Sequence, residues 1–182
     1  FASWSLGKKI GAILGGTLVT VAAIGAVIVA SKLSKINTVK LDTDKLSVSK
    51  EAKKRGSGYL NVALFGVDSR DNDLDKGTRS DTIMIASLNK KTMKVKIASI
   101  YRDTLSEQED GTLNKINAAY SYGGPEGALS VLNKNLDMNI EHYVTVNFNS
   151  MIDIVDSVGG IDIDVQEDEM PYICGYVQEI MK

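Results

Sequence analysis

The hydrophobic positions of this chain form one long run followed by a series of short ones. Residues 10–30 carry no charged side chain, and 21 residues in a helix are enough to cross a hydrocarbon core of about 30 Å. From residue 59 onward, short apolar runs alternate with polar stretches. Such runs, bounded by turn residues, are typical of strands in a sheet that is covered on both faces. The pattern therefore predicts a membrane-spanning helix followed by a globular domain.

The globular part mixes strand and helix patterns. Strands are predicted at residues 59–67, 81–88, 95–100, 142–148 and 161–165. Helices are predicted at residues 114–122, 126–136, 150–158 and 167–182, with a short frayed helix at 49–54. Asn89-Lys90-Lys91-Thr92 has turn chemistry and joins the second and third strands as a hairpin. We therefore expect an α/β fold, a three-layer α-β-α domain with a mixed central sheet, preceded by one transmembrane helix.

The first 58 residues are predicted to anchor this domain to a membrane. They divide into a short flank at 1–9, the transmembrane helix at 10–30 and a basic polar linker at 31–58, and the domain then occupies 59–182. A cleaved signal peptide is the main alternative, but its apolar region is shorter, roughly 7–15 residues; a buried soluble helix is a third. Lysines flank both ends of the run, so charge alone does not decide orientation. We expect the N-terminus in the cytoplasm and the domain outside, because a single cysteine suits an exported protein without disulfides.

Charge is distributed unevenly along the chain. Residues 1–58 hold 10 Lys and Arg against 3 Asp and Glu, whereas residues 59–182 hold 11 against 20. An acidic domain of this kind is a poor match for nucleic acid, which requires a basic surface. The basic linker either remains a solvated stalk, which we favour, or lies along anionic lipid headgroups or wall polymer.

Charged residues stand at the ends of the first three predicted strands. They are Asp68 and Arg70, Arg79 and Asp81, and Arg102 and Asp103. If the first strand is antiparallel to the second, the hairpin brings all six to one edge of the sheet. Two carboxylates there suit Mg²⁺, which binds through oxygen, and guanidinium groups suit phosphate. The pattern favours pyrophosphate chemistry; the alternative is that these are surface charges that pair with one another.

Five motifs carry a resemblance to a known family. They are F-G-V-D-S-R at 65–70, T-R-S-D-T-I-M-I-A-S-L-N at 78–89, I-A-S-I-Y-R-D-T at 97–104, N-K-I-N-A-A-Y-S-Y-G-G-P-E-G-A-L at 114–129 and V-N-F-N-S-M-I-D-I-V-D-S-V-G-G-I-D-I-D-V at 146–165. In this order they resemble the LytR–CpsA–Psr family. The resemblance implies a phosphotransferase outside the cytoplasm that moves an anionic glycopolymer, of teichoic acid or capsule type, from a polyprenyl-pyrophosphate carrier to peptidoglycan.

The resemblance also implies roles for the charged residues. Asp68 and Asp81 match the aspartates that serve Mg²⁺ binding and catalysis, and Arg102 matches an arginine that contacts pyrophosphate. Arg70 and Arg79 lie within the same motifs and are expected, with Asp103, to bind substrate.

Two departures from the family pattern bear on these expectations. Tyr101 stands where the family usually has proline. The family also has a later arginine-rich segment, absent from these residues, so we expect the sequence to be part of a longer protein. Two other functions stay open: a transcriptional attenuator or regulator of envelope genes, and an inactive module that binds lipid pyrophosphate. No helix-turn-helix pattern supports the regulator, and the oligomeric state is left open.

Overall fold

The computed structural model divides the chain into two compact units, Phe1–Lys40 and Leu41–Lys182. The structure describes residues 20, 23–25, 27, 30–31, 38–69, 74 and 77–180. In the first unit, the described positions between 20 and 31 are helical. Among the described residues, no helix has both the length and the apolar character needed to cross a membrane. Most of the predicted span at 10–30 lies outside the described residues, so it stays a prediction.

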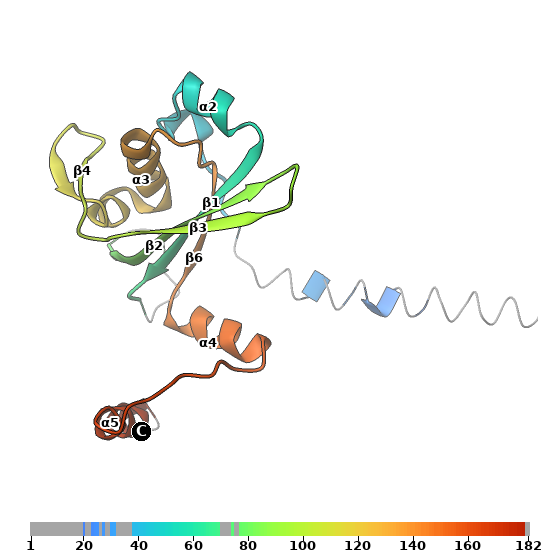
Figure 1. Ribbon diagram of the computed structural model, residues 1–182, viewed down its shortest axis with the longest axis vertical. Coiled ribbons are helices and arrows are strands. Elements are labelled where there is room, and N and C mark those ends of the chain that lie inside the picture. The colour runs from blue at the N-terminus through green and yellow to red at the C-terminus, as the bar shows by residue number, and fades with distance from the viewer. Residues whose placement is uncertain are drawn as a thin grey trace, which may run out of the picture. The chain divides into compact units, whose positions relative to one another are not determined.

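The second unit is built on a mixed four-stranded sheet with the order β3-β2-β1-β6 (Figure 1). Its strands are β1 (Tyr59–Val67), β2 (Ser80–Asn89), β3 (Val95–Ile100) and β6 (His142–Val146). β1 and β3 both pair antiparallel with β2, whereas β6 runs parallel to β1. The predicted hairpin is confirmed, and the Asn89 side chain closes its turn by accepting hydrogen bonds from the backbone N–H groups of Lys91 and Thr92.

Helix α3 (Ala118–Leu136) packs on one face of this sheet. It bends at Gly124, whose φ of 64° and ψ of −157° are not helical, and Pro125 follows directly. The two helices predicted at 114–122 and 126–136 are confirmed as two helical stretches on either side of this kink, because Gly124 and Pro125 interrupt the helical hydrogen bonds. The predicted start at 114 was wrong, however: β5 (Leu113–Lys115) pairs there with β4 (Leu105–Glu107) in a small two-stranded sheet.

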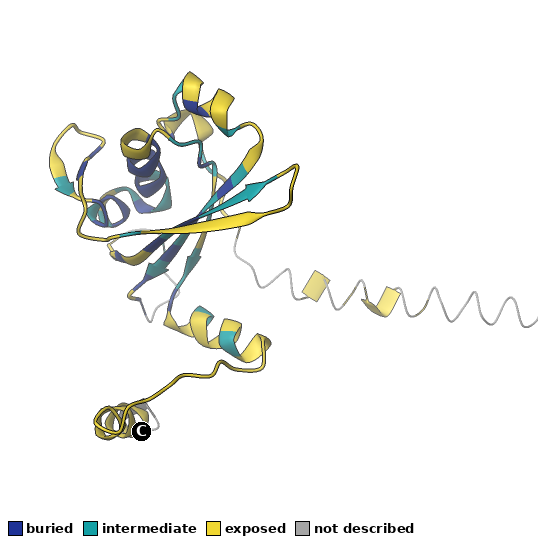
Figure 2. Ribbon diagram, in the orientation of Figure 1, coloured by how far each residue is buried: buried dark blue, intermediate teal, exposed yellow. Residues whose placement is uncertain are grey.

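The hydrophobic core lies between α3 and the sheet. Phe65, Tyr120, Leu129 and Leu132 are each at most 1% exposed, and the rings of Phe65 and Tyr120 meet edge to face at 5.2 Å. Figure 2 shows this contrast, with α3 largely buried and β3 exposed. On β3, Ile97 is 64% exposed. The described residues thus establish a mixed α/β domain in which helix packs on one face of the sheet, and a helical layer on the other face remains an expectation.

The segment predicted as the end of a polar linker packs with the domain. Helix α2 (Lys50–Gly56) is capped by Ser49, whose hydroxyl accepts a hydrogen bond from the Ala52 N–H at 2.9 Å. Before it lies a single 3₁₀ turn, η1 (Thr43–Lys45). Leu46 is fully buried, and the Asn133 side-chain nitrogen donates a hydrogen bond to the Leu46 carbonyl at 2.9 Å. The prediction of a linker reaching residue 58 was therefore wrong, because isolated apolar residues among charged ones gave no period to detect.

The C-terminal part contains two further helices, α4 (Phe148–Ser157) and α5 (Met170–Ile180). Asn147 caps α4 by accepting from the Ser150 N–H at 2.8 Å, so this helix begins before the position predicted. The strand predicted at 161–165 is absent from the structure, where these residues form no ladder and are exposed. Alternating apolar and polar residues form a strand only where a neighbouring strand is available for pairing.

Candidate functional site

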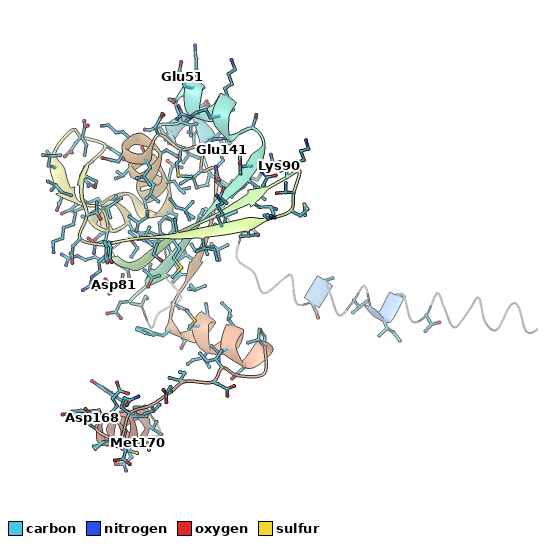
Figure 3. All side chains as sticks on the ribbon, in the orientation of Figure 1. Glu51, Asp81, Lys90, Glu141, Asp168 and Met170 are labelled. Atoms are coloured by element: carbon cyan, nitrogen blue, oxygen red, sulfur yellow. The ribbon has the colours of Figure 1, made fainter. Side chains whose placement is uncertain are left out.

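The register of β2 and β3 brings Asp81 and Arg102 together at one edge of the sheet. Ile83 of β2 pairs with Ile100 of β3, so the residues two positions beyond each lie opposite one another. Arg102 Nη1 is 2.8 Å from Asp81 Oδ1. Figure 3 labels Asp81 at this end of the strands. The structure thus joins two of the residues that the strand order predicted would converge.

A β-bulge shapes the same edge between β1 and β2. Gly66 pairs with Thr82 and Val67 pairs with Ser80, which leaves Asp81 as the extra residue. A bulge redirects the side chain of the residue it adds, and here Ser80 is fully buried while Asp81 is exposed. The close approach requires glycine, because a Cβ on Gly66 would lie 3.0 Å from the Thr82 Cβ. Asp68 follows Val67 directly and is also exposed at this end of the sheet.

Asp103 connects the edge to the β4–β5 hairpin. Its carboxylate lies 2.6 Å from Lys115 Nζ and 3.9 Å from Arg102 Nε. The hydrogen bond from Lys115, helped by the charges of Lys115 and Arg102, lowers the pKa of Asp103 below its ordinary value. The sequence did not mark Lys115 as a site residue, although it lies within one of the five motifs. Only the fold shows it, because the contact joins β5 to the residues after β3.

A hollow of about 360 Å³ opens over this edge. It is lined by Asp81, Thr82, Ile83, Ser99, Ile100, Tyr101, Arg102 and Asp103. The Arg102 and Asp81 side chains are 52% and 42% exposed, so an incoming anion reaches the guanidinium without passing through the core. The chemistry at the surface of the hollow is therefore a cationic fork beside carboxylates, which suits a phosphate group next to a hydroxyl to be deprotonated.

Of the six predicted residues, the structure brings Asp81, Arg102 and Asp103 into contact, whereas Asp68 forms no ion pair with the described residues. Arg79 is exposed and forms no ion pair with the described residues. Arg70 lies outside the described residues, so its predicted part in substrate binding stays a prediction.

The donor set bears on the predicted Mg²⁺. Within the described part of the chain, no three His, Cys, Asp or Glu side chains cluster closely enough to hold a metal ion. Mg²⁺ in phosphate-handling sites takes one or two carboxylates and completes its octahedron with water and substrate oxygens. Asp68 and Asp81 are the carboxylates that would hold the ion in that mode of binding, and the Mg²⁺ site stays a prediction.

The fold and this edge define the class of the protein: a mixed α/β domain that presents arginine and carboxylate side chains at one end of its sheet. The chain belongs to the LytR_cpsA_psr family, whose model matches residues 24–178.

Curated relatives and solved structures are also similar to this chain. The chain is 35% identical over 162 residues to the polyisoprenyl-teichoic acid–peptidoglycan teichoic acid transferase TagU of Bacillus cereus strain AH820, which covers 88% of this chain and 51% of the relative. It resembles the crystal structure of B. subtilis TagV with a TM-score of 0.52 and 35% identity, over 59% of this chain and 43% of that one. A structure of TagT with bound octaprenyl pyrophosphate shares the fold, with a TM-score of 0.53 and 23% identity over 73% of this chain and 47% of that one. The chain thus spans about half the length of the curated relative.

Proposed function

We propose that this protein transfers an anionic glycopolymer of teichoic acid or capsule type from a polyprenyl-pyrophosphate carrier to peptidoglycan. The observation that carries the proposal is the exposed Arg102–Asp81 pair at the hollow, where β2 and β3 bring a guanidinium and a carboxylate within 2.8 Å. Two features of relatives support it: TagU is named as a teichoic acid transferase, and TagT has been crystallised with octaprenyl pyrophosphate.

The reaction needs a nucleophile, a base and charge neutralisation. A hydroxyl of a peptidoglycan sugar attacks the phosphorus nearest the glycan, a new phosphodiester bond forms, and polyprenyl phosphate leaves with the electrons of the broken P–O bond. Asp81 or Asp68 accepts the proton of the attacking hydroxyl. Arg102 donates hydrogen bonds to the pyrophosphate oxygens, where negative charge builds up, and Arg70, Arg79 and the pair of Asp103 with Lys115 shape the substrate-binding surface around it. Asp68 and Asp81 would hold a Mg²⁺ ion, which would supply further positive charge where the leaving group develops.

Location and architecture complete the proposal. Residues 10–30 cross the cell membrane once, the N-terminus is cytoplasmic, and the domain works at the outer membrane face where carrier lipid and peptidoglycan meet. The open face of the sheet, on which Val95 and Ile97 are 57% and 64% exposed, supports a second helical layer that completes the three-layer arrangement.

The test is a transfer assay. The protein, incubated with a lipid-linked glycopolymer, peptidoglycan fragments and Mg²⁺, is expected to release polyprenyl phosphate and to label the peptidoglycan. An inactive pyrophosphate-binding module would bind the carrier without releasing polyprenyl phosphate. A transcriptional regulator would bind DNA and leave the carrier unchanged, and the acidic balance of residues 59–182 disfavours that outcome.

A further inference from the structure

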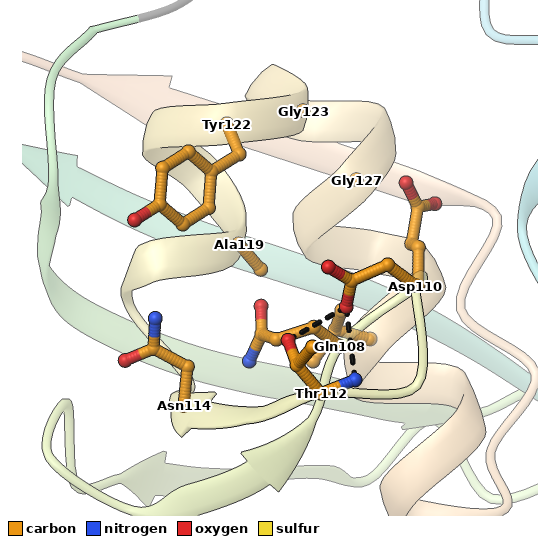
Figure 4. A pocket seen from close by; sticks show the side chains of 10 residues that line it. Gln108, Asp110, Thr112, Asn114, Ala119, Tyr122, Gly123 and Gly127 are labelled. Carbon is orange, nitrogen blue, oxygen red and sulfur yellow. Dashed lines mark hydrogen bonds between the residues drawn. The ribbon is translucent and has the colours of Figure 1, made fainter.

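A second cavity, of about 200 Å³, lies between the β4–β5 hairpin and α3, around the bend of the helix (Figure 4). It is lined by Gln108, Glu109, Asp110, Thr112, Asn114 and Tyr122, with Ala119, Gly123, Gly127 and Val131 as its apolar floor. None of these residues lines the hollow at Asp81 and Arg102. The cavity therefore requires its own explanation.

Two amide side chains leave hydrogen-bonding groups unused in this cavity. Gln108 is only 7% exposed, and its nitrogen donates to the Ser106 hydroxyl at 3.0 Å, whereas its oxygen accepts no hydrogen bond from the described residues. Figure 4 shows that oxygen pointing into the cavity. Asn114 is the reverse case: its oxygen accepts from the Lys115 N–H at 2.8 Å, and its nitrogen donates to no described group. The Gln108 oxygen and the Asn114 nitrogen are therefore available to a ligand as an acceptor and a donor.

Asp110 and Glu109, the two carboxylates of the cavity, differ in their hydrogen bonding. Asp110 accepts hydrogen bonds from the Thr112 hydroxyl and N–H, at 2.7 and 2.9 Å, which lower its pKa and keep it ionised. Glu109 forms no hydrogen bond or ion pair with the described residues, and its Oε2 lies 3.9 Å from the positions that a Cβ on Gly123 or Gly127 would take. The glycines of α3 thus leave space beside a free carboxylate acceptor.

Tyr122 supplies a flat apolar wall. Its side chain is 72% exposed and stands on α3 at the rim of the cavity (Figure 4). An aromatic face beside carboxylate and amide groups is the combination that recognises a sugar ring, because the C–H groups on one face of the ring pack on the aromatic surface while its hydroxyls donate to the acceptors.

The volume and the charge of the cavity limit the class of ligand that can bind there. The volume is below the range of about 300–1,000 Å³ typical of drug-sized ligands, so the cavity takes a single ring. Glu109 and Asp110 repel phosphate and other anions. The free acceptor of Gln108 and the free donor of Asn114 together complement an acetamido group, which has one N–H and one C=O.

We propose that the hairpin–helix cavity binds one neutral N-acetylhexosamine ring of the acceptor glycan. This inference rests on the proposed function for the origin of that sugar. The hairpin supports the link, because Asn114 of the cavity precedes Lys115, which contacts Asp103 at the site. Gln108 lies five positions after Asp103, at most about 18 Å of extended chain, so a glycan strand held here passes close to the attacking position.

The experiment titrates a tetramer of β-1,4-linked N-acetylglucosamine into the isotope-labelled protein and follows amide shifts by NMR. Binding is expected to shift the amides of the β4–β5 hairpin, and Tyr122→Ala is expected to weaken it by at least about tenfold. Glu109→Gln weakens it as well, because a carboxylate is the stronger acceptor. The matched controls are Tyr172→Ala, a tyrosine that is also 72% exposed but lies on α5, and Glu51→Gln, an exposed glutamate of α2; both bind as the unchanged protein does.

Two results would overturn the inference: no binding of the tetramer at millimolar concentration, or equal binding by the Tyr122→Ala and Tyr172→Ala variants. The same samples are titrated with farnesyl pyrophosphate, which separates this inference from the proposed function. Sugar binding without pyrophosphate binding would overturn the transferase proposal and support the sugar site in the cavity. Pyrophosphate binding without sugar binding would overturn only the sugar site.

Discussion

Replacing Arg102 by alanine separates the contribution of this residue to function from its contribution to stability. The Arg102–Asp81 pair is exposed, with side chains at 52% and 42%, and exposed ion pairs contribute about 0.2–1 kcal/mol to the free energy of unfolding. A guanidinium that donates two charge-assisted hydrogen bonds to a pyrophosphate contributes about 1.5–3 kcal/mol for each. Arg102→Ala is therefore expected to lower kcat/KM for release of polyprenyl phosphate by about a hundredfold or more, and to change the free energy of unfolding by less than about 1 kcal/mol.

The matched control is Arg55→Ala. Arg55 forms an ion pair with Asp137 in which the side chains are 60% and 55% exposed, on a part of the domain that does not line the hollow. Its loss is expected to cost a similar small amount of stability and to leave transfer unchanged. The transfer activity of Arg102→Lys should lie between those of Arg102→Ala and Arg55→Ala, because lysine keeps the charge and loses the planar guanidinium group. If Arg102→Ala transferred glycopolymer at the rate of Arg55→Ala, the assignment of Arg102 would be wrong.

Three further predictions concern the framework around the site. Asn133→Ala removes three buried hydrogen bonds of 2.8–3.0 Å to backbone groups and is expected to lower the free energy of unfolding in urea by about 3 kcal/mol; an effect under 1 kcal/mol would contradict the packing of the segment before α2 on this domain. Gly66→Ala places a Cβ 3.0 Å from the threonine opposite on β2 and is expected to cost about 1–3 kcal/mol of stability and to reduce transfer, whereas Gly58→Ala, with no atom within 4 Å, serves as the control for added bulk. Since Lys115 lowers the pKa of Asp103, their interaction stabilises the fold above about pH 4 and is lost as the pH falls through the lowered pKa; in Lys115→Met, NMR titration should show that pKa shifted upward, and an unchanged pKa would exclude the contact.

The sheet could be predicted from the sequence because its strands are almost continuous apolar runs with charged ends. The turn at 89–92 fixed the hairpin, and the hairpin in turn placed Asp81 opposite Arg102. What the apolar pattern could not show was the packing of Leu46, which depends on contacts with residues more than 80 positions away. The kink of α3 could be predicted, because Gly124 and Pro125 interrupt helical hydrogen bonds and so divide the element into two helical stretches.

The candidate site was predictable in part. The charged residues at strand ends could be predicted because the apolar runs and the turn residues mark where each strand ends. The bulge that makes Asp81 the extra residue has no signal in composition, since it arises from the pairing of Val67 with Ser80. Lys115 was missed because the contact it makes with Asp103 depends on a three-residue strand within a segment that also favours helix.

The most direct test of the central claim is an NMR titration of the labelled protein with farnesyl pyrophosphate in the presence of Mg²⁺. The edge formed by β1, β2 and β3 is expected to respond, with amide shifts concentrated at Asp68, Asp81 and residues 99–103, and Arg102→Ala is expected to abolish them. Shifts confined to other parts of the domain, or a response that Arg102→Ala leaves unchanged, would contradict the assignment of this edge as the pyrophosphate site.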